Sequence, residues 1–532
     1  MADNMTPSKN GTSKVKRFAF AFLSAFLVFC AFPPLSLWWL LPVALVPFYI
    51  AVKSARPFES AFVSYCTGFL LFSLVCYWLA EVTLAGLFVA AFIAAFYYLG
   101  FGVAVTLLRH QKKIPLSVVA AAVWCVMEFL RSKLFWLAFP WALIPHPLYE
   151  QTILIQAAEL FGVWGYSFII PLLNFALAEI LLSFARRERV KIGQIITVVL
   201  IIILVPLYGL IRLPSVKTEP SLRVLIVQGN IPQNIKEEAI QGMRRGVSAE
   251  RILNLAEYML SSHLALTHKG LQEAGSVELV VWPETMVPGS LFESPDRYVR
   301  VASFVKRSGV PLFLGTERRS GKKRLNSAAL IMPDGSVNDV YDKMVLVPVG
   351  EYIPARSVFP LFATIIENMM PYETEDLSEG ERLTIFELNG KRFACLICFE
   401  LSFCELVRQA IKSGAEVIVN ISNDAWFGRS TELELAVAQA VFRAVEARRP
   451  VLRAVNAGIS CYVSPEGYIT YLEKDGEKKQ VEGVLAVKVE TSRIGTIYLV
   501  AGDYIPYICI LLVVVSALFH LIKNKESHIV GR

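Results

Sequence analysis

Three observations predict a helical membrane base joined to an α/β domain. Of the 532 residues, 55% are hydrophobic and only 18% are charged, and the mean hydropathy is positive, a composition typical of proteins that leave apolar surface to lipid. Eight segments are apolar over a length that can cross a bilayer. Between residues 213 and 495, short β-branched runs alternate with stretches rich in Ala, Glu and Arg, which indicates an α/β domain.

The apolar segments define the predicted organisation of the chain. The first could be a cleaved signal peptide, but it lacks a small-residue cleavage pattern and runs directly into more apolar sequence, so we expect it to be retained. The eight predicted helices lie near residues 18–35, 37–52, 59–79, 82–108, 115–131, 160–184, 193–212 and 504–522. The predicted parts are a cytoplasmic tail at 1–17, a membrane domain of seven helices at 18–212, a soluble domain at 213–495, the eighth helix with its lead-in at 496–523 and a cytoplasmic tail at 524–532.

The basic residues predict how the chain lies in the membrane. Short loops retained in the cytoplasm are enriched in Lys and Arg, whereas translocated short loops are not. A cytoplasmic N-terminus agrees with five basic loops, and only Arg131 and Lys133 go against it. With eight spans, both termini then lie inside and residues 213–495 lie outside. The same distribution accounts for the formal net charge of +7 without nucleic-acid binding. The basic loops are "KVKR" at 14–17, Lys53 with Arg56, "RHQKK" at 109–113, "RRERVK" at 186–191 and "KNK" at 523–525.

Three residues at the ends of predicted strands, or in the loops after them, form a candidate reactive set. Glu284 ends the run "VELVVWPE", Cys398 follows "RFACLI", and Lys343 lies in the loop "YDKMVLVPVGEYIP". Such a trio suits acyl transfer, because a thiolate can attack a carbonyl, a carboxylate can move the proton and an ammonium can stabilise negative charge. Taken singly, Glu284 would more often be a loop acid and Lys343 would usually be a solvated lysine.

The pair Cys395 and Cys398 has the spacing of a redox dithiol or of half a metal site. Residues three apart in a strand point to opposite faces, and no second such pair or His cluster accompanies them, so we expect no metal site and a single reactive thiol. On this interpretation Cys398 is the reactive residue, whereas Cys395, Cys404 and Cys461 are structural.

The motifs "WPE" at 282–284, "DK…VPVGEYIP" at 342–354 and "CFE" at 398–400 resemble those of the nitrilase, or carbon–nitrogen hydrolase, superfamily. Together with the predicted spans, "SNDAWFG" at 422–428 and "FPWALIPHPLYEQ" at 139–151, they make the whole chain similar to the apolipoprotein N-acyltransferase family.

The resemblance implies a nitrilase-type α-β-β-α sandwich on an eight-helix base, and it assigns roles to the site residues. It implies that Glu284 is the general base, Lys343 the oxyanion-stabilising cation and Cys398 the nucleophile. Glu351 and Glu400 would be further acids that line or brace the site. Trp426 and Phe427 could flank an acyl chain, or could simply pack their loop.

The implied activity moves an acyl chain from a phospholipid to Cys398 as a thioester, and then to the α-amine of a diacylglyceryl-modified cysteine at the N-terminus of an apolipoprotein. No metal or organic cofactor is implied. We expect a monomer in the bacterial inner membrane, with its catalytic domain in the periplasm.

Two alternatives remain open from the residues. One is a membrane-tethered amidase that hydrolyses its acyl-enzyme with water. The other is a transporter or receptor whose nitrilase-like domain only binds, although a binding module has no need of the complete trio and the helices lack the paired, broken segments of a transporter midplane. The roles of Glu237 in the loop at 228–240, and of Glu128, Arg131 and Glu179 in the apolar segments, are not set by the sequence.

Overall fold

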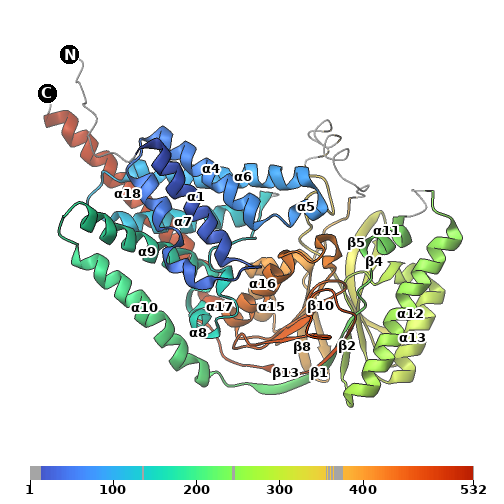
Figure 1. Cartoon of the computed structure of the whole chain (residues 1–532). Helices are drawn as coiled ribbons and strands as arrows, with labels where there is room; N and C mark the ends of the chain where they lie inside the picture. Colours follow the sequence, from blue (N-terminus) through green and yellow to red (C-terminus); the bar gives the residue numbers. More distant parts are fainter. Residues whose placement is uncertain are drawn as a thin grey trace.

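The computed structural model describes residues 13–134, 137–241, 246–354, 356, 360, 364 and 376–530. Long helices from both ends of the chain gather in one half of the molecule, and two β-sheets with their covering helices form the other half (Figure 1). The strands that the structure describes lie between Glu219 and Thr491, so the sheets form between the seventh and eighth predicted spans.

Helices form in all eight of the predicted apolar segments, but only five of these helices are long and apolar enough to cross a membrane within the described part of the chain. These five are α4 (Pro57–Val75), α6 (Leu84–Leu108), α9 (Ala158–Ala185), α10 (Ile192–Arg212, continued to Ser215) and α18 (Tyr504–Val530, apolar over 504–522). The protein is therefore a helical membrane protein, and the prediction of eight spanning helices is not confirmed.

The other three apolar segments are not among these five, because one is broken into short helices and two include more charged residues. The segment Trp38–Lys53 is broken into a 3₁₀ turn (Trp38–Leu40), α2 (Leu41–Ala44) and α3 (Val46–Lys53), and α2 and α3 each have a proline in their first turn, where the missing N–H starts a new helix. Helices α1 (Lys14–Ala31) and α7 (Leu116–Lys133) are continuous, but each includes three charged residues.

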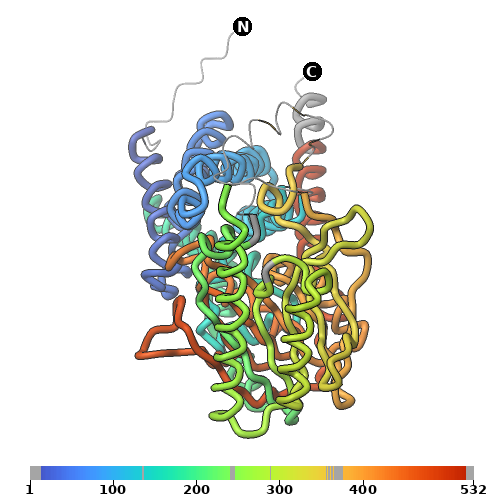
Figure 2. Tube along the Cα trace, turned by 90° about the vertical axis from the view of Figure 1, so that its right-hand side faces the viewer, coloured from blue at the N-terminus to red at the C-terminus, as the bar shows by residue number. Residues whose placement is uncertain are grey.

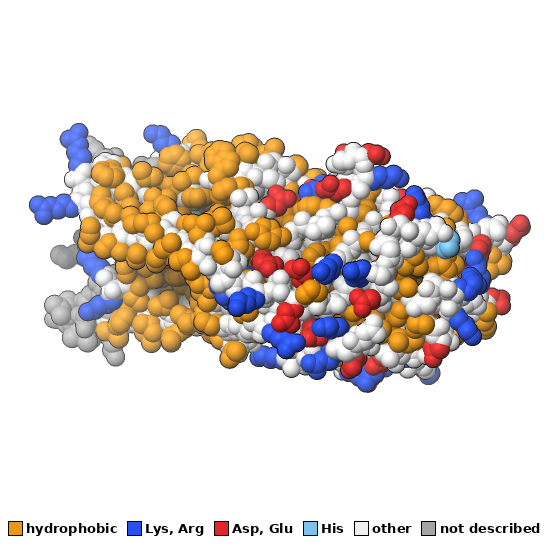
Figure 3. Space-filling model, turned by 90° about the horizontal axis from the view of Figure 1, so that it is seen from below, with side chains coloured by type: hydrophobic (Ala, Val, Ile, Leu, Met, Phe, Trp, Pro, Cys, Tyr) orange, Lys and Arg blue, Asp and Glu red, His pale blue; other side chains and the backbone are white. Residues whose placement is uncertain are grey.

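Charged side chains mark the end of the helical half that lies away from the sheets. Arg17 pairs with Glu59, and Lys53 Nζ lies 2.5 Å from Glu179 Oε1. A belt of exposed apolar side chains separates this end from the charged surface of the sheets (Figure 3). Large apolar side chains of α10 and α18, such as Ile202, Leu210 and Leu511, are more than half exposed, which is the surface expected to face lipid.

Two sheets pack face to face. The first has the order β13-β1-β2-β4-β5-β6, with β3 beside β4, and the second has the order β12-β11-β10-β9-β8-β7. The first sheet consists of β1 (Glu219–Gln228), β2 (Leu279–Val281), β3 (Val287–Ser290), β4 (Leu312–Ser320), β5 (Lys323–Ile331), β6 (Val337–Asp342) and β13 (Gly483–Thr491). The second consists of β7 (Ile385–Leu388), β8 (Lys391–Ile397), β9 (Val417–Ser422), β10 (Val451–Val455), β11 (Cys461–Val463) and β12 (Ile469–Tyr471).

Strand β8 shows how the layers are built. Phe393, Cys395 and Ile397 point into the core between the sheets, whereas Ala394 and Leu396 belong to the core on the opposite face, as the two-residue period of a strand requires. Helices α12 (Ala249–Ala274) and α13 (Pro295–Ser308) cover the first sheet (Figures 1 and 2). Helices α15 (Cys404–Lys412) and α16 (Glu432–Ala447) cover the second, which makes four layers, α-β-β-α.

The α15–α16 layer also lies against the membrane helices. One continuous apolar cluster includes residues of α16 and of α7 and α9, and all 16 residues of α16 are buried. Polar contacts cross the same boundary: Arg448 Nε donates to Glu159 Oε2 at 2.6 Å, and Val163 N donates to Glu446 Oε1 at 2.7 Å. Helix α17 (Ile497–Ala501) then leads the chain from the sheets into α18.

Candidate active site

The structure brings Glu284, Lys343 and Cys398 to one edge of the sandwich. Glu284 follows β2 and Lys343 follows β6 in the first sheet, whereas Cys398 follows β8 in the second. Strands β1, β2 and β4 run parallel to one another, as do β8, β9 and β10, and β6 runs in the same direction as β4 because two antiparallel pairings separate them. Carboxyl ends of parallel strands meet at one edge, where α/β folds place their sites.

Several loops at this edge have a left-handed backbone at residues other than glycine. The φ angles are +51° at Thr285, +70° at Val349 and +53° at Cys398. A side chain in this region costs about 1–2 kcal/mol, and such costs are concentrated at functional sites. At Cys398 the turn ends β8 and begins the 3₁₀ segment Cys398–Ser402, so the thiol leaves the line of the strand.

The Lys343 ammonium is buried between two carboxylates. Its Nζ lies 2.8 Å from Glu351 Oε2 and 3.9 Å from Glu284 Oε1, and the side chain is 1% exposed. Burial disfavours the charged form of Lys343, but the charges of Glu351, of a Cys398 thiolate and of Glu284 outweigh it and hold the lysine pKa above its usual value. The group is therefore a permanent cation that can face developing negative charge.

Asparagines hold Glu284 in place. Asn326 Nδ2 donates to Glu284 Oε1 at 2.6 Å and to Glu351 Oε1 at 3.1 Å. The backbone N–H of Asn423, just after β9, donates to Glu284 Oε2 at 3.0 Å. Each carboxylate oxygen of Glu284 thus has a fixed donor, and its direction is set by both sheets.

The environment of Cys398 keeps the thiol protonated at rest. Burial raises its pKa to about 12, with the Glu284 charge adding to the effect and the Lys343 charge opposing it. A nucleophile of this kind needs a base at the moment of attack. Glu284 is the carboxylate that contributes most to the thiol pKa, and it is the base that the geometry offers.

Glu400 lies under the site and braces it. The carboxylate is fully buried and accepts hydrogen bonds from the Tyr341 hydroxyl at 2.8 Å, Met344 N at 2.6 Å, Val345 N at 3.0 Å and Ile397 N at 2.7 Å. Because these donors belong to the Lys343 loop and to the residue before Cys398, Glu400 ties the cation and the nucleophile together. The geometry therefore supports the bracing role.

The remaining cysteines lie apart from this chemistry. Cys395 is fully buried between the sheets, and the cysteines of the chain are all free thiols in the structure. The side chains of Cys404, Glu405 and Asp503 lie close enough together to bind one metal ion. Their carboxylates instead pair with Lys133 and with Arg408, whose Nη1 lies 2.6 Å from Asp503 Oδ1.

Comparison with known proteins decides the family. Residues 24–176 match the family described as apolipoprotein N-acyltransferase N-terminal domain, and residues 239–497 match carbon–nitrogen hydrolase. An apolipoprotein N-acyltransferase of Azotobacter vinelandii is 30% identical over 82% of this chain and 83% of its own length. The chain belongs to the apolipoprotein N-acyltransferase family.

Other members of the apolipoprotein N-acyltransferase family match almost the whole length. The protein of Geobacter metallireducens is 29% identical over 96% of both chains, and that of Haemophilus influenzae is 26% identical over 97% of both. Among solved structures, an amidase from Nesterenkonia sp. is similar to 52% of this chain and 92% of its own, with 17% identity and a TM-score of 0.35, a value too low to support an inference.

Aromatic side chains connect the site of this apolipoprotein N-acyltransferase family member to its membrane half. The ring of Phe399, next to Cys398, lies 5.6 Å from Trp141, and Phe427 lies 5.2 Å from Trp78. Trp426 is half-buried beside it. Phe427 thus packs its loop against the membrane region.

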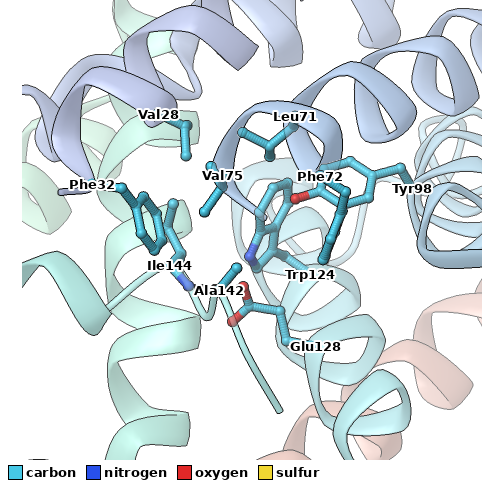
Figure 4. Close-up of a pocket in the computed structure, with 10 residues that line it drawn as sticks. All are labelled: Val28, Phe32, Leu71, Phe72, Val75, Tyr98, Trp124, Glu128, Ala142 and Ile144. Carbon is cyan, nitrogen blue, oxygen red and sulfur yellow. Dashed lines mark hydrogen bonds between the residues drawn. The ribbon is translucent and has the colours of Figure 1, made fainter. Parts of the chain in front are cut away.

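Glu128 and Arg131 fasten the loop that carries Trp141. Glu128 Oε1 accepts the N–H of Ile144 at 2.9 Å, and Arg131 Nη1 donates to the Trp141 carbonyl at 2.6 Å. A cavity of about 10 Å³, with room for about one water molecule, adjoins Glu128 and Trp124 (Figure 4). The structure therefore gives both charged residues a positioning role.

The sequence alone did not identify several further residues around the trio. Asn326 lies within β5 and gave no signal, whereas Asn423 was part of a motif of which only the aromatic residues were interpreted. Behind the nucleophile, the Ser422 hydroxyl donates to Asp424 at 2.6 Å, and Asp424 pairs with the buried Arg453. Ser422 ends β9 and Asp424 follows it, and this position at a strand end was the available signal.

Proposed function

We propose that this protein transfers an acyl chain from a membrane phospholipid to the α-amine of the diacylglyceryl-modified cysteine of apolipoproteins. The transfer has two half-reactions joined by a thioester on Cys398, and residues 213–495 are the catalytic unit. The observation that carries the proposal is the Lys343 ammonium held between Glu284 and Glu351 beside the strained Cys398. The family supports the choice of substrates, and the geometry supports the proposed chemistry.

In the first half-reaction, Glu284 takes the proton of the Cys398 thiol, and the sulfur attacks the carbonyl carbon of the phospholipid ester. Lys343 stabilises the negative oxygen of the tetrahedral intermediate. The bond to the glycerol oxygen then breaks, and Glu284 returns the proton to that oxygen. The products are a thioester and a lysophospholipid.

In the second half-reaction, the α-amine attacks the thioester carbonyl and Glu284 accepts a proton from the nitrogen. The carbon–sulfur bond breaks, and the proton returns to the Cys398 sulfur. An amide replaces a thioester, so this step is downhill and draws the first one forward. The bracing by Glu400 and the asparagine contacts keep the same three groups in place for both steps.

We place the protein in the bacterial inner membrane with residues 213–495 in the periplasm. The basic loops lie at the far end of the helical half from the sheets (Figures 1 and 3), which supports this orientation. The two exceptions, Arg131 and Lys133, are engaged elsewhere, with the Trp141 carbonyl and with Glu405. Alkaline phosphatase fused after residue 220 should be active and after residue 190 inactive; the reverse result would overturn the orientation.

Phe427 and Trp426 are proposed to border the acyl chain as it enters from the membrane side. Phe427 already contacts Trp78, so the ring is positioned at the junction between the two halves. Phe427→Ala should therefore raise the phospholipid concentration needed for half-maximal acylation more than it lowers the maximal rate. An unchanged dependence on phospholipid would leave the ring only a packing role. We expect the functional unit to be a monomer, because the three candidate reactive residues all belong to one chain.

The deciding experiment tests the first half-reaction alone. Purified full-length protein receives acyl-labelled phospholipid and no acceptor, and a ping-pong enzyme must then become labelled itself. The label should map to Cys398, be released by neutral hydroxylamine and be absent from Cys398→Ser, with Cys395→Ser as the matched control. Adding a diacylglyceryl-cysteine peptide with a free α-amine should remove the label, and the acetylated peptide should not.

Other outcomes would favour the alternatives. Steady release of free fatty acid without acceptor would mean that water resolves the intermediate, as in an amidase. Binding of phospholipid without any covalent label would mean that Cys398 is not a nucleophile and that the domain only binds.

A further inference from the structure

A second buried lysine lies at the site. Lys236 is on α11 (Gln233–Gln241), the helix that follows β1, and its side chain is 7% exposed. Its Nζ donates to the backbone carbonyl oxygen of Glu284 at 3.4 Å, and no carboxylate among the described residues lies within 4.0 Å of it. A buried ammonium without a close counterion is costly unless it serves something else.

The same asparagine that orients the base also holds α11. Asn423 donates its backbone N–H to Glu284 Oε2 at 3.0 Å, and its side-chain amide to Gln233 Oε1 at 2.9 Å. Asn456 fixes the segment before α11 by exchanging hydrogen bonds with the backbone of Ile231 at 2.8 and 2.9 Å. Lys236 is therefore held in a fixed position relative to the base.

The charges facing this position show what the ammonium can do. Glu317 and Asp424 are neutralised by Arg324 and Arg453. Glu400 is held by the Tyr341 hydroxyl and three backbone N–H groups. Apart from it, the carboxylates of Glu284 and Glu351 face the ammonium of Lys343, an excess of one negative charge unless a second cation is present. The titratable and charged groups around Lys236 and Cys398 are Glu284, Glu317, Arg324, Lys343, Glu351, Glu400, Asp424, Arg453 and, from α12, His263.

We propose that Lys236 is a positioning residue of the reaction, a second cation that balances the charge while the proton moves from Cys398 to Glu284. Before the transfer, Glu284 and Glu351 face two ammonium groups. After it, Glu284 is neutral, and the Cys398 thiolate and Glu351 face the same two. The anion count is unchanged, so the proton moves without leaving an uncompensated buried charge.

Electrostatics of the lysine agree with this geometry. Burial lowers the pKa of Lys236, while Glu284, Glu317 and a Cys398 thiolate each raise it, and the Lys343 charge lowers it further. The interaction with Cys398 is reciprocal, because a cation that is stabilised by the thiolate stabilises the thiolate in return.

The test measures thiol ionisation directly, without lipid. Detergent-solubilised full-length protein is alkylated with iodoacetamide over a range of pH, and the rate at the Cys398 peptide is followed by mass spectrometry. An opposite charge nearby shifts a pKa by about one unit or more, so Lys236→Met should lower the rate at a fixed pH by about tenfold. Lys236→Arg should retain most of the rate, and Lys412→Met, which removes an exposed lysine of the same domain, should not differ from the parent.

A structural role predicts a different pattern. If Lys236 only stabilised the fold, Lys236→Met would lower the melting temperature and leave the pH profile of alkylation unshifted, which would overturn the inference. On our proposal the alkylation profile of Lys236→Met shifts to higher pH whatever happens to the melting temperature, because the loss of the second cation makes the Cys398 thiolate less stable. The inference relies on the proposed function only for the roles of Cys398 and Glu284. If that function were wrong, the parent protein would fail to acquire acyl label while the alkylation profile still reported on Lys236.

Discussion

Two regions of this protein hold buried charges in different ways. Where α16 meets the membrane helices, Arg448 is fully buried against Glu159 and the Pro465 carbonyl, and Arg443 lies 2.6 Å from Glu446. At the strand ends, Lys343 is shared between two carboxylates and Cys398 is only partly covered. The first arrangement fixes one half of the molecule on the other, whereas the second leaves a proton and a nucleophile free to react.

The largest expected effect comes from breaking the junction. In Arg448→Met, Glu159 keeps Arg212 as a partner, but the buried carbonyls of Pro465 and Gln156 lose their donor at about 1–3 kcal/mol each, so the free energy of unfolding should fall by about 2–6 kcal/mol. Arg429→Met removes an exposed pair with Glu477 and should cost about 0–1 kcal/mol. Thermal unfolding of the two variants checks the difference. Equal losses would mean that burial of the pair does not matter and would remove the contrast between the regions.

Charges at the site should affect rate far more than stability. Loss of an oxyanion-stabilising cation costs about 10²–10³ in rate, and loss of a general base about 10²–10⁴. Lys343→Ala and Glu284→Gln should each reduce acyl transfer by about a hundredfold or more, measured as labelled lipoprotein formed. Lys412→Ala is the control and should be fully active. A site variant with substantial transfer would remove that residue from the mechanism.

The alkylation rate of Cys398 should change in opposite directions when the charge of Glu284 or of Lys343 is removed. The Glu284 charge raises the pKa of Cys398 and the Lys343 charge lowers it. Below the thiol pKa, the thiolate fraction grows as that pKa falls, so Glu284→Gln should be alkylated faster than the parent at a given pH and Lys343→Ala more slowly. Both variants lose turnover, so the opposite shifts in alkylation rate, followed against pH, distinguish electrostatic effects from damage. Shifts in the same direction would contradict the assignment.

The smallest effect on activity is expected at the other cysteine of the pair. Cys395 is fully buried in the core between the sheets and is not part of the reacting groups. Cys395→Ser places a hydroxyl in that apolar core, at a cost of about 1–3 kcal/mol in stability, and should retain most of the acyl transfer measured below its unfolding temperature. If it were as inactive as Cys398→Ser, the two thiols would have to act as a unit.

Much of the site could be predicted because its residues follow strands whose period is visible in the sequence. Glu284, Lys343 and Cys398 each end such a run or lie in the loop after it, and the structure brings the three together. Asn326 and Lys236 could not be found this way, since one lies inside a strand and the other on a helix. Their roles depend on which atoms meet across the two sheets.

The prediction of apolar helices is confirmed, whereas the prediction that eight of them span the membrane is not confirmed, for a physical reason. Hydropathy finds apolar stretches, but it does not distinguish a spanning helix from apolar segments buried against other protein. Pro42 and Pro47 break the second segment, and Glu128 and Arg131 of α7 bind a loop. Apolar residues of both segments belong to the cluster that also includes α16 and joins the two halves of the molecule.

By itself the sequence determined the apolar segments, the alternation of residues along the strands, the strand ends and the basic loops, because each of these depends on neighbours along the chain. It therefore specified an α/β domain within a helical membrane protein and the three candidate reactive residues. Only the tertiary structure decided that α16 is buried on every side, that Asn423 orients Glu284 and that Lys236 lies beside the base. These depend on contacts between segments far apart in the chain, and no local pattern encodes the packing that brings them together.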